Sequence, residues 1–492
     1  MHTLATTSSS ASPGVASRPS KPTLCVDLDN SLLATDLLWE SFLTAIKRNP
    51  IVLILAPLWL MRGRAYLKAR LAERADLRPD LLPYREDVVG YLCEEKRSGR
   101  SVWLVTGSDS ALANRLASYL GVFDGVVASD GRRNLSGATK ADFLEREFGR
   151  GRFSYLGDSR RDVTVWRRAA SALVVSGSDS LVRQAAQVTQ LEKRFTVPRA
   201  RLKDIARALR LRHWSKNALL FLPMLLAHKF RVISLVREAI AFVCFGLAAS
   251  SIYVLNDLLD LQSDRQHPWK SARPLAAGCL SIPSAMFLSA VLGVGAIIGS
   301  WIFLGTTATF LLATYCALSI SYCLFFKRIA LGDVFILTSF YTLRILTGGV
   351  IAPVRLSPWF MAFSGLFFFS LALAKRYSEL VLAQELVSSG NSGRGYRTGD
   401  HALLSELGVG SALAAIVIFC LYTQSPDVLA LYARPSFVLM VAPLLLFWTA
   451  RLWLKAHRGQ LDEDPISLAL KDPASYWVGL AVVLLIAMGT LR

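Results

Sequence analysis

Long apolar runs in the second half of the chain constrain the fold more than any other feature. The 492 residues are 53% hydrophobic and only 18% charged, an excess of apolar side chains that a wholly soluble protein does not carry. Nine candidate membrane helices follow the basic stretch 199–216, near residues 217–229, 238–258, 283–304, 306–326, 331–350, 358–376, 405–424, 435–454 and 475–491. We therefore expect an all-α membrane bundle of nine helices over residues 205–492.

The net charge of +19 is explained by the membrane. A charge of this size would also suit nucleic acid, but basic loops between membrane helices and anionic lipid headgroups account for it more simply. The basic residues are concentrated in one set of loops, which predicts a bacterial-type inner membrane protein with its amino terminus in the cytoplasm. We expect no nucleic-acid partner, and the sequence carries no signal for an oligomeric state.

Residues 22–197 read as a separate α/β domain. Short apolar runs at 24–26, 102–105, 125–128, 154–156 and 172–175 alternate with helical stretches, which is typical of a parallel sheet. Residues at about 37–90 are expected to form a helical cap. Residues 1–20, rich in Ser, Ala, Pro and Thr, are expected to be a disordered tail.

One segment of this domain is unusually apolar. The run 51–61 (IVLILAPLWLM) is too short to span a bilayer, and basic residues follow it. A buried helix of the cap is the first interpretation. The alternative is a hairpin that rests on the membrane.

Two aspartates directly follow the first expected strand. Asp27 and Asp29 would lie at its carboxyl end, where open α/β sheets bind ligands. One carboxylate there can attack phosphorus, and the other can protonate the leaving oxygen and then activate water. Further groups would hold a phosphate oxygen, balance its charge and bind magnesium together with the two aspartates: Thr106, Lys140, and the pair Asp158 and Asp162.

In this order, these four motifs resemble the haloacid dehalogenase (HAD) superfamily over residues 22–197. The resemblance implies a Rossmannoid α/β fold and a magnesium-dependent phosphohydrolase with Asp27 as nucleophile. An acid/base aspartate at position 29 accompanies the phosphatases of that superfamily. A folded but catalytically idle regulatory domain is the alternative.

A dense acidic stretch ends the second expected membrane helix. On a continuous helix Asn256, Asp260 and Asp264 fall on one face, with Asp257 beside them. Carboxylates this close repel one another, and a divalent cation removes that cost and provides a handle for a diphosphate. Side chains placed to meet phosphate oxygens follow at once: His267, Lys270 and Arg273.

Written out, NDxxDxxxDxxHPxKxxRP resembles the UbiA superfamily of membrane transferases, and within it the decaprenyl-phosphate phosphoribosyltransferase branch. The resemblance implies a nine-helix bundle whose active site faces the cytoplasm. It implies that Mg²⁺ held by Asn256, Asp257, Asp260 and Asp264 binds phosphoribosyl diphosphate, while a polyprenyl phosphate attacks the anomeric carbon. Asp260 and Asp264 would be catalytic. The substrate-binding residues implied are Lys216, His267, Lys270, Arg273, Lys327, Asp333, Arg344, Lys375, Arg376 and Glu379.

Two other functions compete with this interpretation. The first is that of an aromatic polyprenyltransferase, which uses a prenyl diphosphate. Aromatic prenyltransferases of the superfamily carry a second carboxylate cluster after the fourth helix, where this chain has only Asp333 beside Lys327 and Arg328. A non-enzymatic lipid carrier or scaffold would not need the acidic stretch. If both halves are enzymes, the phosphatase would remove the 5-phosphate of the transferase product or clear another phosphate ester.

Overall fold

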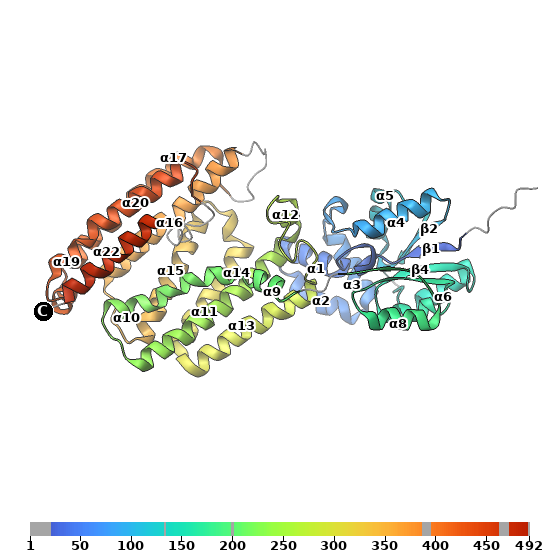
Figure 1. The fold of residues 1–492 in the computed structure, drawn as a ribbon, viewed down its shortest axis with the longest axis horizontal. Helices are drawn as coiled ribbons and strands as arrows, with labels where there is room; N and C mark the ends of the chain where they lie inside the picture. The colour runs from blue at the N-terminus through green and yellow to red at the C-terminus, as the bar shows by residue number, and fades with distance from the viewer. Residues whose placement is uncertain (1–20, 132–133, 198–200, 386–394, 462–471, 491–492) are drawn as a thin grey trace, which may run out of the picture. The chain divides into compact units, whose positions relative to one another are not determined.

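The computed structural model describes residues 21–131, 134–197, 201–385, 395–461 and 472–490 (Figure 1). The tail expected at 1–20 lies outside the described residues. The chain divides into two compact units. The first comprises Met1–Asp204 together with Leu258–Pro283, and the second comprises Ile205–Asp257 together with Ser284–Arg492. The acidic stretch is therefore divided between them, with Asn256 and Asp257 in the second unit.

The first unit is built on a six-stranded parallel sheet in the order β3-β2-β1-β4-β5-β6. Its strands are β1 (Thr23–Val26), β2 (Val102–Asp109), β3 (Gly125–Ser129), β4 (Phe153–Gly157), β5 (Ser171–Val175) and β6 (Gln190–Phe195). The predicted parallel α/β fold is confirmed. The sixth strand was not expected, because β6 is mostly exposed and carries the charged run Glu192–Arg194 in place of an apolar one.

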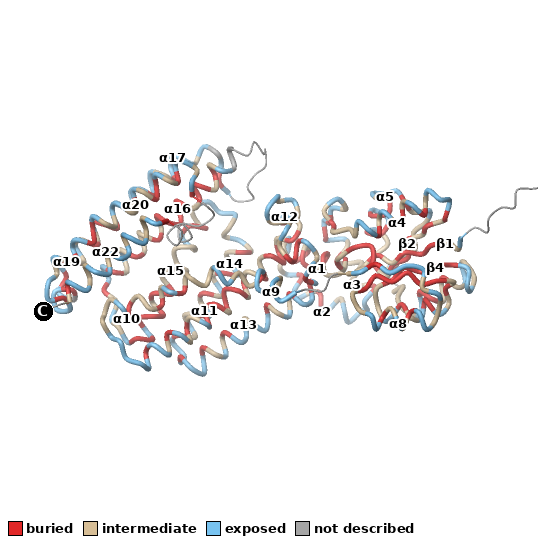
Figure 2. Tube along the Cα trace, viewed as in Figure 1, coloured by how far each residue is buried: buried red, intermediate tan, exposed pale blue. Residues whose placement is uncertain are grey.

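Helices pack on both faces of the sheet and bury most of β1, β2, β4 and β5 (Figures 1 and 2). Leu92 and Leu116 belong to the core on one face, and Leu144 and Leu181 belong to the core on the other. The helices that supply these residues are α4 (Glu86–Arg97) and α5 (Ser110–Leu120) on the first face, and α6 (Ala138–Phe148) and α8 (Asp179–Val188) on the second. The short elements η3 (Arg160–Asp162) and α7 (Val163–Trp166) connect β4 to β5.

Three helices fill the segment between β1 and α4: α1 (Leu37–Arg48), α2 (Val52–Met61) and α3 (Arg64–Arg74). The π-helical turn η1 (Leu28–Leu32) precedes them and the 3-10 turn η2 (Pro79–Leu81) follows. The expectation that the apolar run 51–61 is buried is wrong. It forms α2, but only Val52 and Ala56 are buried there, while Ile54 is 72% and Met61 85% exposed.

The second unit is helical, and the described residues contain eight helices that are long and apolar enough to cross a membrane. Seven are single helices and one is the pair α19 and α20: α11 (Val232–Leu259), α13 (Ile282–Leu304), α14 (Thr306–Leu324), α15 (Gly332–Ile351), α16 (Pro358–Glu385), α17 (His401–Thr423), α19 (Pro435–Leu439) with α20 (Val441–His457), and α22 (Pro473–Thr490). Shorter elements are α9 (Leu202–Leu209), η5 (Phe326–Arg328), η6 (Thr398–Asp400) and α18 (Pro426–Leu431).

The first of the nine expected spans, 217–229, is not a spanning helix. It is divided between the 3-10 helix η4 (Leu211–Phe221) and the short helix α10 (Leu222–Leu226). Pro223 opens α10, and Asn217 is buried with its amide donating to the Phe242 carbonyl of α11. A buried polar side chain and a proline both favour a break here over a continuous helix.

The acidic stretch is also interrupted. The sequence pattern predicts one continuous helix through Asn256, Asp260 and Asp264, but α11 ends at Leu259 and α12 (Leu261–Gln266) begins after Asp260. The Asp264 amide still donates to the Asp260 carbonyl at 2.8 Å. The four side chains therefore do not share one straight helical face.

Candidate functional site

The first site lies where the order of the sheet reverses. β1 pairs with β2 on one side and with β4 on the other, so the connections that leave β1 and β4 run in opposite directions. Ligands of open α/β sheets bind at such a point, at the carboxyl ends of the strands. Asp27 directly follows β1 and Asp158 directly follows β4, which places the two predicted site residues at this switch point.

Three of the four predicted metal ligands of this domain come together. Oxygen atoms of Asp27, Asp158 and Asp162 all lie within 4.8 Å of one another, and no other such group occurs in the part of the chain that the structure describes. The Asp162 carboxylate accepts bonds from the Ser159 amide at 2.9 Å and its hydroxyl at 2.8 Å. A Cβ at Gly157 would lie 2.8 Å from the Asp162 carboxyl, so the close approach requires glycine.

The electrostatics of this cluster fit a divalent cation. Burial raises the pKa of Asp27 to about 6, and the neighbouring Asp162 carboxylate adds to the shift. Burial, together with the carboxylates of Asp162 and Asp27, raises the pKa of Asp158 well above its usual value. Three oxygen donors that repel one another are the ligand type that Mg²⁺ prefers, and the cation would relieve the repulsion.

Lys140 reaches Asp27 from α6. Its ammonium donates to Asp27 Oδ1 at 2.9 Å and to the Tyr155 hydroxyl at 2.8 Å. Burial alone would lower the pKa of Lys140, but the carboxylates of Asp27 and Asp162 outweigh it and raise that pKa. The cation is thus held charged beside the predicted nucleophile. Tyr155, a buried residue inside β4, was not anticipated from the sequence.

Asp29 and Thr106 do not belong to the group of three close carboxylates. Asp29 accepts bonds from the Leu37 amide at 2.8 Å and the Ser108 hydroxyl at 2.5 Å, and burial raises its pKa to about 6. A carboxyl of this kind can carry a proton near neutral pH, which suits an acid/base role better than the ligand role also predicted for Asp29. Thr106 is fully buried in β2, and its Oγ1 accepts from the Ser108 amide at 3.1 Å.

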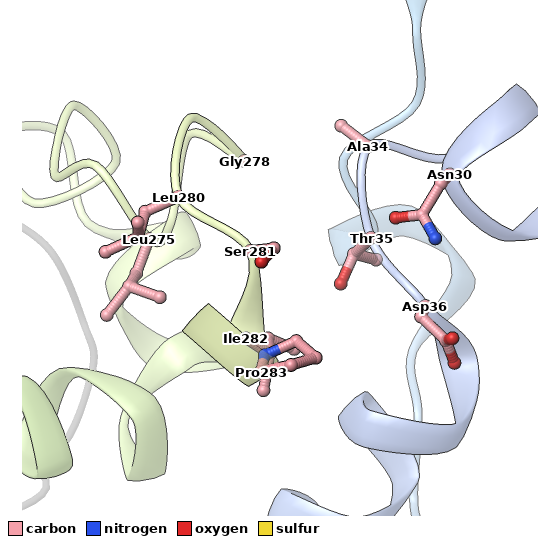
Figure 3. Close-up of a pocket in the computed structure, with 10 residues that line it drawn as sticks. All are labelled: Asn30, Ala34, Thr35, Asp36, Leu275, Gly278, Leu280, Ser281, Ile282 and Pro283. Atoms are coloured by element: carbon pink, nitrogen blue, oxygen red, sulfur yellow. The ribbon is translucent and has the colours of Figure 1, made fainter. Parts of the chain in front are cut away.

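A cavity of about 170 Å³ opens within the first unit beside this site (Figure 3). One wall is the loop after Asp29, and the other is the end of the segment 258–283. The residues that line the cavity are Asn30, Ala34, Thr35, Asp36, Leu275, Gly278, Leu280, Ser281, Ile282 and Pro283.

Within the first unit, the acidic stretch is covered by cations. Lys47 of α1 forms an ion pair with Asp260 at 3.0 Å, and Arg273 pairs with Asp264 at 2.6 Å. His267 accepts a bond from the Trp269 amide at 3.4 Å. Lys47 was not among the predicted site residues, because it lies more than 200 positions away in the sequence. Lys270 is half-buried in the same segment.

The second unit holds the other half of the stretch. Arg210 pairs with Asp257 at 2.5 Å, and the Lys327 ammonium lies 3.4 Å from Asn256 Oδ1. Arg210 was not among the predicted site residues, although it lies in the basic stretch 199–216 that the sequence shows before the first expected span. Lys216 lies 5.9 Å from the Tyr341 ring centroid.

Three predicted substrate-binding residues form a buried network within the second unit. The Arg376 guanidinium donates to Asp333, to Glu379 at 2.6 Å and to the Tyr322 hydroxyl at 2.9 Å. The Tyr396 hydroxyl donates to Asp333 as well. Asp333 is fully buried, so its carboxylate is occupied by protein groups.

The remaining predicted cations differ in exposure. Arg344 is buried, donates to Asn217 at 2.9 Å and to the Tyr315 hydroxyl at 3.2 Å, and stacks on the Tyr315 ring at 4.7 Å. Lys375 is half-buried within α16.

Comparison with known proteins gives a match over nearly the whole chain. An uncharacterized protein, y4nM, of Sinorhizobium fredii is 37% identical over 468 residues, which are 93% of this chain and 89% of that protein. The decaprenyl-phosphate phosphoribosyltransferase of Mycolicibacterium smegmatis is 34% identical over 239 residues, 47% of this chain and 73% of that enzyme. A solved structure of a substrate-bound phosphoserine phosphatase covers 37% of this chain and 95% of its own, at 15% identity and a TM-score of 0.28.

The chain also matches the UbiA prenyltransferase family over residues 218–469. This match covers half of the chain and includes seven of the eight candidate membrane helices in full, from α11 to α20. The chain is a multi-pass membrane enzyme that belongs to the UbiA prenyltransferase family.

Proposed function

We propose that the membrane half transfers 5-phosphoribose from phosphoribosyl diphosphate to a polyprenyl phosphate. The observation that carries this proposal is the hydrogen bonding of Asp333. Its side chain is the only carboxylate from the end of α14 through the first turn of α15. Its oxygens accept bonds from Arg376 and Tyr396, so it is not available as the core of a second metal cluster. The relationship to a phosphoribosyltransferase over 239 residues points the same way.

The distribution of charge suits a substrate with many phosphate oxygens. Asp257, Asp260 and Asp264 each pair with a cation. Asn256 and these three aspartates would hold Mg²⁺, which supplies a positive charge for the diphosphate. Cations released from the carboxylates would then be free to contact phosphate oxygens.

The chemistry assigned to the chain's own residues is electrostatic. An oxygen of the lipid phosphate forms a bond to the anomeric carbon, and the bond from that carbon to the diphosphate oxygen breaks. Negative charge accumulates on the departing diphosphate. Lys270, Arg273, Lys327 and Arg344 would stabilise that charge by donating to the diphosphate oxygens.

We further propose that the amino-terminal half is a phosphatase. Asp27 would attack phosphorus through a carboxylate oxygen as the bond from phosphorus to the leaving oxygen breaks, and Asp29 would deliver a proton to that oxygen. Asp29 would then take a proton from the water that hydrolyses the phosphoaspartate, which releases phosphate and restores Asp27. Lys140 would hold Asp27 in place and balance charge, and Thr106 would bind a phosphate oxygen. Asp27, Asp158 and Asp162 would hold the Mg²⁺ that neutralises the phosphate.

In this proposal the two halves act in sequence on the cytoplasmic side of a bacterial inner membrane. The transferase product carries a 5-phosphate, and the phosphatase on the same chain would remove it. Joining two sites on one chain raises the local concentration of the shared intermediate.

A product mass spectrum tests both proposals. Purified protein in detergent is incubated with Mg²⁺, polyprenyl phosphate and phosphoribosyl diphosphate, beside an Asp27→Asn variant and an Asp260→Asn variant. We expect wild type to yield the ribose lipid without its 5-phosphate, Asp27→Asn to stop at the 5-phosphorylated lipid, and Asp260→Asn to yield neither. If wild type and Asp27→Asn both stop at the 5-phosphorylated lipid, the transferase proposal stands and the phosphatase acts elsewhere. Prenylation of an aromatic acceptor from a prenyl diphosphate, with no sugar lipid, would refute phosphoribosyl transfer.

A further inference from the structure

The helix α2 exposes an apolar surface that the amino-terminal domain does not cover. Ile54 is 72% exposed and Met61 85%, and four further large apolar side chains are about half exposed: Ile51, Leu53, Leu58 and Leu60. Of the ten residues of α2, only Val52 and Ala56 are buried. Contiguous exposed apolar surface of this kind marks a membrane or partner contact site, because water penalises it.

The sequence on both sides of α2 is basic, and the nearest acidic residue after it, Glu73, pairs with Arg70 and Arg74. Residues 41–72 contain six basic residues and no Asp or Glu: Lys47, Arg48, Arg62, Arg64, Lys68 and Arg70. Arg62 and Arg64 are exposed and follow directly after the last apolar residue. Arg74 stacks on the Trp59 ring at 4.8 Å, and Arg62 on the Tyr66 ring at 5.5 Å. Cations and amphipathic rings beside an apolar helix are typical of the interface between lipid headgroups and hydrocarbon.

We propose that α2 docks the amino-terminal domain on the membrane by entering the outer part of a leaflet that contains anionic lipid. Ten residues of helix extend about 15 Å, half the thickness of the hydrocarbon core, so α2 cannot span the bilayer. A second copy of this chain fits the surface less well, since each copy would bring the same exposed Arg62 and Arg64 to the contact. The chain also carries its own membrane anchor, which keeps lipid at high local concentration.

The same hairpin reaches the phosphate site. α3 begins immediately after Gly63, whose φ of 110° turns the chain between the two helices. Lys68, in the middle of α3, donates to the Gly107 carbonyl at 2.5 Å, next to Thr106 within β2. Docking of α2 therefore constrains a helix that contacts the part of β2 where a phosphate would bind.

Lipid-depth quenching tests the proposal on the full-length protein in nanodiscs. A fluorophore is attached at Ile54→Cys in a background in which the exposed Cys279 and the half-buried Cys93, Cys316 and Cys420 are serine. The control label is at Tyr119→Cys in α5, a site that is 54% exposed. The probe lipids carry a nitroxide on the acyl chain, in phosphatidylcholine with or without phosphatidylglycerol.

We expect the label at position 54 to be quenched strongly and the label at position 119 weakly. Quenching at position 54 should increase with phosphatidylglycerol, and Arg62→Glu with Arg64→Glu should remove that increase, because each basic residue near an anionic surface contributes roughly fivefold to binding. Equal quenching at the two positions would overturn the proposal. A further sample carries the nitroxide on a second copy of the protein and none on the lipid. Quenching at position 54 in that sample alone would also overturn the proposal, because it would make α2 a dimer contact. Neither readout depends on transferase or phosphatase activity.

Discussion

A buried ion pair joins α1 of the amino-terminal unit to α12, the short helix that contains Asp264. Arg265 and Glu40 approach to 2.6 Å, with side chains only 8% and 1% exposed. The Thr35 hydroxyl also donates to Glu40 at 2.9 Å, and Arg265 donates to the Ala276 carbonyl at 3.3 Å. We predict that Glu40→Gln releases α12 from α1.

The magnitude follows from the burial. Removing one partner of a buried pair leaves the other charge desolvated and costs about 3–5 kcal/mol, or at least about 100-fold in the local opening equilibrium. The exposed pair Arg78–Asp80 is the matched control, because its side chains are 56% and 41% exposed at a similar distance of 2.7 Å. Arg78→Gln should cost under about 1 kcal/mol.

Hydrogen exchange measured by mass spectrometry on full-length protein in detergent is the assay. Peptides that cover Leu261–Gln266 should lose protection in Glu40→Gln and in Arg265→Gln, but not in Arg78→Gln. The double variant Glu40→Leu with Arg265→Leu should be less destabilised than the sum of the two single leucine variants. Additive effects, or a Glu40→Gln effect no larger than that of Arg78→Gln, would refute the reasoning.

Three further predictions concern the charged sites. Lys47→Met should lower the Mg²⁺ concentration needed for half-maximal transfer, since Lys47 competes with the metal for Asp260 at 3.0 Å; an unchanged or higher requirement in a Mg²⁺ titration would contradict this. The pKa of Asp27 is raised to about 6, so Mg²⁺ affinity of the amino-terminal site should fall as the pH drops through 6 and protons occupy the carboxyl, which calorimetric titration at several pH values measures. Arg376→Gln should destabilise the membrane unit by about 3–5 kcal/mol, because it leaves buried Asp333 without its ion pair. The midpoint temperature of thermal unfolding in detergent should be well below that of an Arg78→Gln control.

Local sequence patterns determined the outline of the amino-terminal site. Apolar runs located five of the six strands. An aspartate that follows a parallel strand lies at the carboxyl end of that strand, so Asp27 and Asp158 could be predicted from the sequence to belong to one site. Tyr155 and Ser108 were not anticipated, because a side chain on a strand reaches the site only through the packing of neighbouring strands and helices.

Hydropathy likewise determined the membrane half, because a spanning helix needs an apolar run long enough to cross the hydrocarbon core. It located eight spanning helices, and it was wrong at 217–229, where a buried amide and a proline outweigh composition. The continuous helix through Asp260 was expected from the spacing of the acidic residues, and the structure interrupts the helix there.

Only the tertiary structure decided which charges meet. The pairs Lys47–Asp260 and Arg265–Glu40 join residues more than 200 positions apart, and the exposure of α2 depends on what packs against it. The periodicity of apolar residues in the sequence indicates which face of a helix or strand is apolar, because that face is determined by neighbours along the chain. The partner of a charge and the cover of a helix are set by the assembled fold, because both are properties of neighbours in space.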